Sequence, residues 1–249
     1  MEIEHIALLL VGGFVAGIIN TLAGGGSLIT VPLLVFLGLP GTIANGTNRI
    51  GVLLQSTVGA LRFRAEGVSG FRDSVPVLLP LVSGSLIGAI GVSRLTDATF
   101  ERLFGIVMLL LLVPVLRSTA GSTSDSAVPR EPWGPTMSAA VFFVIGVYGG
   151  AVQAGVGILL VLALARSGYD LVKANSIKLV VVAAFTAAAV VVFVWEGQVV
   201  WAPALLLAVA TSLGATVGAR MAVRGGEKVI RPFLVASVIA LAGKMLGFY

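Results

Sequence analysis

The sequence predicts an all-α polytopic membrane protein made of two inverted-topology repeats, with broken or re-entrant helices after glycine-rich breaks. Hydrophobic residues make up 57% of the 249-residue chain and charged residues only 11%, whereas a soluble domain carries about 25% charged residues. The mean hydropathy is +1.07, and the apolar residues form long uncharged stretches. The two halves of the chain also resemble each other. Lipid is therefore the solvent that we expect around most of the chain.

The composition excludes several kinds of site. The chain has one His and no Cys, which excludes a disulfide framework, a thiol nucleophile and a Cys/His metal site. We expect no cofactor and no metal. The net charge of +5 would suit nucleic acid, but the basic residues stand at the ends of apolar runs, where they orient a membrane protein. We therefore expect a lipid bilayer and no nucleic acid as partners, and the sequence allows a homodimer.

Glycine and proline divide the chain into apolar segments. A helix that crosses about 30 Å of hydrocarbon needs roughly 20 residues. Residues 5–48 carry no charged side chain and are too long for one helix, so we expect breaks at Gly24–Gly26 and at Gly38–Gly41. The start, MEIEH, lacks the basic residues of a secretory signal, so the first segment is expected to be retained. The predicted segments are 6–23, 28–38, 43–63, 74–93, 103–117, 135–153, 158–166, 174–195, 199–219 and 230–248.

Two of these segments are too short to cross a bilayer. Residues 28–38 and 158–166 would rise only about 17 and 14 Å as helices, and each follows a glycine-rich break. We interpret each as a half-helix or one arm of a re-entrant hairpin; the alternative is a tilted full crossing that continues through the glycines. Broken helices at matching positions in two halves indicate a transport site.

One polar stretch divides the chain. Residues 118–134 contain Ser, Thr, Gly and Asp, followed by Pro129 and Pro132, as in a flexible linker. The predicted organisation is an N-terminal transmembrane repeat (1–117), a cytoplasmic linker (118–134) and a C-terminal transmembrane repeat (135–249), all within one integral membrane domain.

The two repeats align without a gap. When the first half is moved along the chain until Gly25 falls on Gly155, polar and glycine positions coincide as well as apolar ones. This agreement at polar positions indicates a duplication, because apolar composition alone would not produce it. The matched residues include Gly38 and Gly168, Asn45 and Asn175, Glu66 and Glu196, Gly84 and Gly214, Gly88 and Gly218, and Arg94 and Arg224.

The basic loops indicate that the repeats are inverted. Loops rich in Lys and Arg face the cytoplasm. The first repeat has its basic loop at Arg62, Arg64 and Arg72, whereas the second has its basic loop at Arg220–Arg231. These loops occupy different positions in the two repeats, so we expect opposite orientations. The prediction places the N-terminus outside, the linker inside and the C-terminus outside.

Two cations lie inside apolar segments, and intramembrane charge is a functional hypothesis by default. Arg49 and Lys178 each follow an Asn near a helix start, Asn45 or Asn175. Helix N-termini present free N–H groups and the positive end of the helix dipole, so two such ends meeting near the pseudo-twofold axis would hold an anion. The alternative is that both cations snorkel to the interface. Thr47, Asn48 and Ser176 could add donors or only cap their helices.

The glycine breaks are the second candidate for substrate binding. Glycines allow backbone N–H groups to turn toward a ligand, and the neighbouring Asn20 and Gln153 add side-chain donors. The alternative is that these glycines serve only close helix packing. The candidate residues at the breaks are Asn20, Gly24, Gly25, Gly26, Ser27, Gln153, Gly155 and Gly157.

Enzymatic readings find little support. No acidic residue lies deep in an apolar segment, and no Walker motif is present, so we expect neither an enzyme nor direct coupling to ATP. The lack of buried carboxylates also removes the usual proton relay.

The chain resembles the sulfite exporter TauE/SafE family, also called the toluene-sulfonate uptake permease group. The resemblance extends from Gly13 to about Gly243, and Gln153–Gly157 departs from it because a glycine-denser run would be typical. It implies an inverted-repeat fold and transport of sulfur-containing anions such as sulfite, sulfonates or sulfoacetate. The motifs that carry it are GFVAGIINTLAGGGSLITVPLL, TIANGTNRIG, GVYGGAVQAGVGILL and KANSIK.

The sequence therefore favours a secondary transporter that moves a small sulfur oxyanion or organosulfonate across a bacterial or archaeal cytoplasmic membrane. The alternative is an anion channel of the same fold. A channel would show flux that does not saturate and would show no counterflow.

Overall fold

The computed structural model describes residues 3–106, 133–226, 228–230 and 232, and all regular elements in these ranges are helices. Four of the helices are long and apolar enough to cross a membrane: α1, α4, α8 and α9. Residues 97–106 are also helical. The bounds are α1 (Ile3–Leu22), α2 (Ser27–Phe36), α3 (Gly41–Ala65), α4 (Phe71–Ser93), α6 (Pro135–Ala151), α7 (Val156–Arg166), α8 (Leu171–Trp195) and α9 (Trp201–Gly225).

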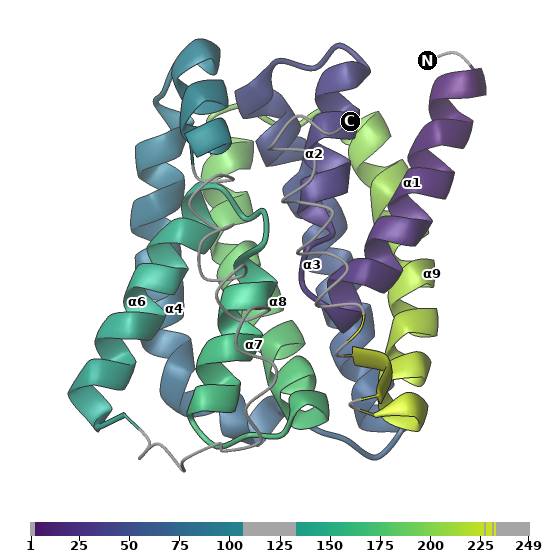
Figure 1. The fold of residues 1–249 in the computed structure, drawn as a ribbon. Helices are drawn as coiled ribbons and strands as arrows, with labels where there is room; N and C mark the ends of the chain where they lie inside the picture. The colour runs from purple at the N-terminus through teal and green to yellow at the C-terminus, as the bar shows by residue number, and fades with distance from the viewer. Residues whose placement is uncertain (1–2, 107–132, 227, 231, 233–249) are drawn as a thin grey trace.

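The expected short segments are short helices. Helix α2 has 10 residues and α7 has 11, so each rises about 15–17 Å, which is well below the thickness of a bilayer core. In Figure 1, α1 descends from the N-terminus and α2 returns toward the same end, whereas α6 rises from the opposite end and α7 returns toward it.

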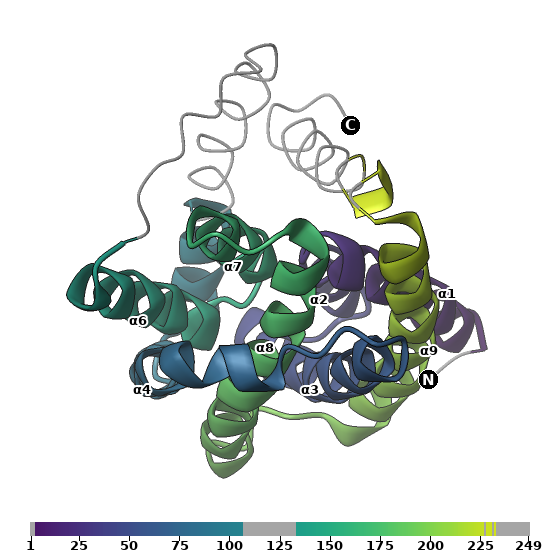
Figure 2. The same cartoon turned by 90° about the horizontal axis from the view of Figure 1, so that it is seen from below.

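Helix packing joins the two halves of the chain. Helix α1 packs along α9, α4 packs along α6, and α3 packs against both α8 and α9. Glycines allow these close approaches, because a Cβ at Gly88 would overlap the carbonyl oxygen of Val147 and one at Gly214 would overlap that of Phe14. The paired small residues of α4 and α9 therefore serve helix packing. Seen from below in Figure 2, α3 and α8 lie between the outer pairs α1–α9 and α4–α6.

The loops gather at two ends of the molecule. At one end, Lys173 Nζ lies 2.7 Å from Asp73 Oδ2, and Arg220 Nε lies 3.6 Å from Glu66 Oε1. These contacts bring the basic loops of both halves together. At the other end, Asp97 accepts hydrogen bonds from Thr42 N at 3.0 Å and from Thr42 Oγ1 at 2.6 Å. These bonds hold the pKa of the Asp97 carboxyl below its usual value.

Several boundaries differ from the sequence-based segments. The segment expected at 103–117 begins earlier, because Thr96 accepts from the backbone of Thr99 and Phe100 and so starts a helix at residue 97. Helix α6 ends at Ala151, after 17 residues, because the chain turns at Gln153 with a φ of 66°. Residues 107–117, most of the predicted linker and most of the segment at 230–248 lie outside the described residues.

Candidate functional site

The two glycine breaks touch each other. Gly24, between α1 and α2, has a φ of 86°, which favours glycine. Its position leaves no room for a side chain, because a Cβ there would overlap the backbone of Gly157, and a Cβ at Gly157 would overlap Gly24. Two segments that lie more than 130 residues apart in the chain therefore meet at backbone contact.

Lys178 caps the end of α1 beside the first break. This residue of α8 is 1% exposed. Its Nζ donates to Asn20 O and Thr21 O at 2.9 Å each and to Asn175 Oδ1 at 2.6 Å. The last carbonyls of a helix have no partner within the helix and carry the negative end of its dipole. The ammonium group therefore stabilises the end of α1, and its three donors are all in use.

Arg49 caps the end of α6 in the same way beside the second break. This residue of α3 is 0% exposed. Its Nη1 donates to Gly149 O at 2.7 Å, and its Nη2 donates to Gly150 O at 2.6 Å and to Ala151 O at 3.0 Å. The guanidinium carbon lies 4.8 Å from the centre of the Phe193 ring, within the range of a cation–π contact.

The two caps are reciprocal. Arg49 belongs to the first half of the chain and caps a helix of the second half, whereas Lys178 belongs to the second half and caps a helix of the first. Burial of both side chains does not fit the snorkelling alternative, because a snorkelling side chain carries its charge to water.

The helix ends beside the cations differ from those expected. The N-termini of α3 and α8 do not meet: Thr42 bonds Asp97 at one end of the molecule, and Lys173 donates to Ser69 O at the other. The cations instead lie at the C-termini of α1 and α6. The reason is that Arg49 and Lys178 stand about two turns inside their helices, level with the breaks.

Polar side chains surround the first break. Asn20 Oδ1 accepts from Gly26 N at 3.2 Å, while its Nδ2 donates to Gln55 Oε1 at 2.8 Å. The structure thus places Asn20, Gly24, Gly26, Ser27 and Asn48 together. Asn48 Nδ2 donates to Ser27 Oγ at 3.1 Å, and its Oδ1 accepts from Thr30 Oγ1 at 2.6 Å.

The second break has fewer polar groups. Gln153 Oε1 accepts from Arg49 Nη1 at 2.8 Å, and its Nε2 donates to Thr186 Oγ1 at 3.3 Å. Gly155 has a φ of 72° and directly precedes α7. The hydroxyl of Tyr148 donates to Ala154 O across the same turn. Gln153 therefore binds helices of both halves while its own backbone takes a conformation that is uncommon outside glycine.

Two predicted site residues bond elsewhere. Thr47 Oγ1 accepts from Val200 N at 3.0 Å, and Ser176 Oγ donates to Val68 O at 3.1 Å. Each contact joins a helix to a loop: the Thr47 bond lies at the α8–α9 loop, and the Ser176 bond lies at the α3–α4 loop, at the opposite end of the molecule. Sequence reasoning missed Thr30, Gln55 and Thr186, which bond the break residues. Gln55 directly follows the apolar run Val52–Leu54 in a segment expected to cross the membrane, and this signal could have identified it.

No carboxylate neutralises the two buried cations among the described residues. Every described Asp and Glu is exposed or partly exposed, and the two ion pairs found there involve Lys173 and Arg220 at the end of the molecule. The described residues also contain no group of three His, Cys, Asp or Glu side chains that could hold a metal.

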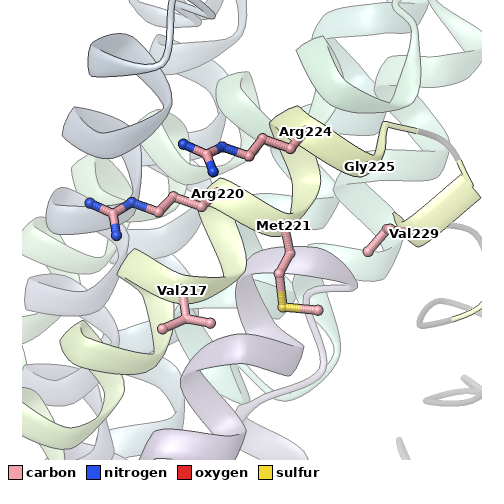
Figure 3. Close-up of a pocket in the computed structure, with 6 residues that line it drawn as sticks. All are labelled: Val217, Arg220, Met221, Arg224, Gly225 and Val229. Atoms are coloured by element: carbon pink, nitrogen blue, oxygen red, sulfur yellow. The ribbon is translucent and has the colours of Figure 1, made fainter.

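An open cavity lies away from the breaks, at the end of α9. It has a volume of about 510 Å³ and is lined by Val217, Met221, Gly225 and Val229 together with Arg220 and Arg224. Figure 3 shows that the two arginines extend side by side, away from the side chains of Val217 and Met221. The cavity belongs to the end of the molecule that carries the basic loops.

Known proteins resemble this chain over nearly its whole length. The family model described as "Sulfite exporter TauE/SafE" matches residues 9–245. "Probable membrane transporter protein ORF9" of Sinorhizobium sp. is 28% identical, over 97% of this chain and 92% of its own length. A "Probable membrane transporter protein" of Haemophilus influenzae is 27% identical, over 98% and 95%. "Probable membrane transporter protein YfcA" of Escherichia coli K12 is 26% identical, over 93% and 86%. No solved structure matches the chain.

Proposed function

Because the chain belongs to the sulfite exporter TauE/SafE family of membrane transporters, we propose that it is a secondary transporter of a small sulfur-containing anion. The substrate belongs to the class of anions that includes sulfite, sulfonates and sulfoacetate. The anion binds where the two glycine breaks meet, between two halves of inverted topology. Asn20, Gln153 and the glycines of the breaks approach the anion, while Arg49 and Lys178 supply positive charge.

The observation that carries the proposal is a pair of buried cations, Arg49 and Lys178, with no buried carboxylate in the part of the chain that the structure describes. A charge in a low-dielectric interior is costly unless it is paired. The C-terminus of a helix offers only about half an elementary negative charge, so each cap leaves positive charge uncompensated. A small anion between the breaks completes the neutralisation, and a neutral substrate does not.

One further feature supports the inverted arrangement. The basic loops of the two halves lie at one end of the molecule, as the contact between Arg220 and Glu66 requires. The positive-inside rule places this end in the cytoplasm. The protein then lies in a cytoplasmic membrane, with its N-terminus and its α8–α9 loop on the outer side.

The test is anion uptake into proteoliposomes. Purified protein is reconstituted and presented with sulfite, sulfate, thiosulfate and a sulfonate. We expect saturable uptake of at least one sulfur anion, with affinity reduced roughly tenfold to a hundredfold in Arg49→Gln, because a charge-assisted hydrogen bond contributes about 1.5–3 kcal/mol. Lys178→Gln should also weaken uptake.

The matched control is Arg94→Gln, which removes an exposed cation at the end of α4. Its uptake should equal that of the unmodified protein. Unchanged affinity in both Arg49→Gln and Lys178→Gln, in folded protein, would move the anion site away from the caps.

A further inference from the structure

Asn45 and Arg49 lie side by side on α3, and each keeps one buried polar atom without a partner. Asn45 Nδ2 and Arg49 Nη2 donate to the same oxygen, Ala151 O, at 2.9 and 3.0 Å. Both side chains are 0% exposed. Among the described residues, Asn45 Oδ1 and Arg49 Nε have no hydrogen-bond partner. The two groups therefore present one free acceptor and one free donor in the same neighbourhood.

The orientation of the Asn45 amide is fixed by its surroundings. Ala151 O can only accept, so the amide nitrogen must face it, and the unpartnered atom of Asn45 must be the oxygen. An unpaired buried acceptor is unfavourable, so a group that donates to it would be stabilised there. A ligand that fits both atoms must accept from Arg49 Nε and donate to Asn45 Oδ1.

We propose that the transported anion is recognised in its protonated, singly charged form, with its acidic hydrogen on Asn45 Oδ1 and an oxygen on Arg49 Nε. A hydrogensulfite-type monoanion has this chemistry. The fully deprotonated ion has no hydrogen to donate, so its oxygen lone pair would face the lone pairs of the Asn45 oxygen and be repelled. This assignment rests on the proposed function, because it names the ionisation state of the substrate at that same site.

The assignment also offers a route for proton coupling that needs no proton-carrying side chain. No Asp or Glu among the described residues is buried, so the interior offers none of the carboxylates that usually relay protons in transporters. A substrate that binds as a monoanion carries its own proton through the site and releases it on the other side, where it ionises.

The repeat supplies a matched control at Asn175. This residue occupies the position in α8 that Asn45 occupies in α3, but both of its amide atoms are in use. Its Nδ2 donates to Leu171 O at 3.1 Å, and its Oδ1 accepts from Lys178 Nζ at 2.6 Å. Of these two matched positions, Asn45 alone therefore keeps an acceptor for a donor on the substrate.

Other charged and titratable groups on the neighbouring helices must be separated from the effect. Tyr148 on α6 interacts electrostatically with Arg49, and Lys178 on α8 is bonded to α1. Asp97 and Glu101 lie beside the N-terminal end of α3 and are exposed, and Arg220 and Arg224 on α9 are exposed at the end of the molecule. Titration of any of these groups would act on every singly charged anion alike, so a monoanion that does not titrate serves as the reference.

The experiment measures the binding of two anions to the full-length protein by calorimetry. The pH is varied across the range in which hydrogensulfite loses its proton to become sulfite. Methanesulfonate is the reference, since it carries one charge and no acidic hydrogen throughout. We expect sulfite affinity relative to methanesulfonate to fall roughly threefold to tenfold as the pH rises, the worth of one hydrogen bond. Asn45→Ala should abolish this pH-dependent difference, whereas Asn175→Ala should retain it even if overall affinity falls.

Parallel pH profiles for the two anions in the unmodified protein would overturn the proposal, and this result needs no variant. The proposal would also be overturned if the pH-dependent difference between the two anions survived in Asn45→Ala. The partner of the Asn45 oxygen in the unmodified protein would then be a bridging water. Failure of the proposed function looks different, because neither anion would then bind to the unmodified protein.

Discussion

At the residue scale, Arg49 and Lys178 each have two roles that depend on the same positive charge. Each closes the C-terminus of a broken helix, and each leaves positive charge beside the other half of the chain. Arg49 is the more versatile, because its guanidinium reaches three backbone carbonyls and still keeps Nε free. Lys178 uses its three donors fully. The two cations should therefore contribute unequally to anion binding.

The geometry of the guanidinium predicts the effect of Arg49→Lys. Lysine keeps the charge but offers a compact point charge in place of a planar fork. It cannot span the carbonyls of Gly149, Gly150 and Ala151 together, so we expect anion affinity to fall about tenfold and the melting temperature in detergent to fall. Calorimetry and thermal unfolding measure the two effects. Arg94→Lys, at an exposed position, should change neither, and normal affinity in Arg49→Lys would show that the planar fork is not required.

At the element scale, the chain combines long helices with two short ones that begin directly after a glycine turn. Helix α2 follows Gly24–Gly26, and α7 follows Gly155. Irregular backbone is tolerated at membrane depth only where protein or a water-filled cavity surrounds it. The contact between Gly24 and Gly157 meets this condition, because each break covers the other.

The contact between the breaks predicts a difference between two glycine substitutions. Gly24 and Gly38 both have a left-handed φ, 86° and 92°, so Ala strains the backbone at either position. Only Gly24 also lacks space for a Cβ; nothing lies within 4 Å of one at Gly38. Gly24→Ala should lower the free energy of unfolding by roughly 1–3 kcal/mol more than Gly38→Ala does. Gly24→Ala should also reduce uptake. Equal loss in the two variants would argue against tight contact between the breaks.

At the scale of the whole molecule, both halves place their basic loops at one end. Arg62 and Arg64 end α3, while Arg220 and Arg224 end α9. The opposite end carries Arg94 and Arg102 together with Asp97, Glu101 and Glu196, so its charges nearly balance. This asymmetry predicts one orientation in the membrane.

The inverted arrangement can be tested by cysteine labelling, since the chain has no Cys of its own. Ser69 lies in the loop after α3, and Gln198 lies in the corresponding loop after α8. With a reagent that does not cross the membrane, Gln198→Cys should react from outside in intact cells, whereas Ser69→Cys should react only after the cells are opened. Ser124→Cys, in the predicted linker outside the described residues, should behave like Ser69→Cys. Labelling of Ser69→Cys and Gln198→Cys from the same side would contradict inversion.

The transport mode predicts counterflow. A secondary transporter exposes its site to one side at a time, so unlabelled anion on one side should accelerate entry of labelled anion from the other. We expect this acceleration and saturable uptake in proteoliposomes. Flux that rises linearly with concentration, without acceleration, would favour the anion channel.

Much of the architecture could be predicted from sequence. Apolar length and glycine punctuation located the helices and both breaks, because a crossing helix needs about 20 apolar residues and a turn at positive φ favours glycine. The short helices at 28–38 and 158–166 were placed within two residues of α2 and α7. The start of the helix at residue 97 was missed, because the Thr96 cap is a single polar residue among other polar residues.

The sequence by itself determined that this chain is a membrane protein of the TauE/SafE family, with two cations inside apolar segments and two glycine breaks. Only the tertiary structure decided what those residues contact. Arg49 bonds carbonyls about one hundred residues away, and Lys178 bonds Asn20, which lies 158 residues away in the chain. Local patterns record helix length and turn chemistry, which neighbouring residues fix. They carry no information about which helix end faces a side chain, because that depends on how α3 and α8 pack between the outer pairs.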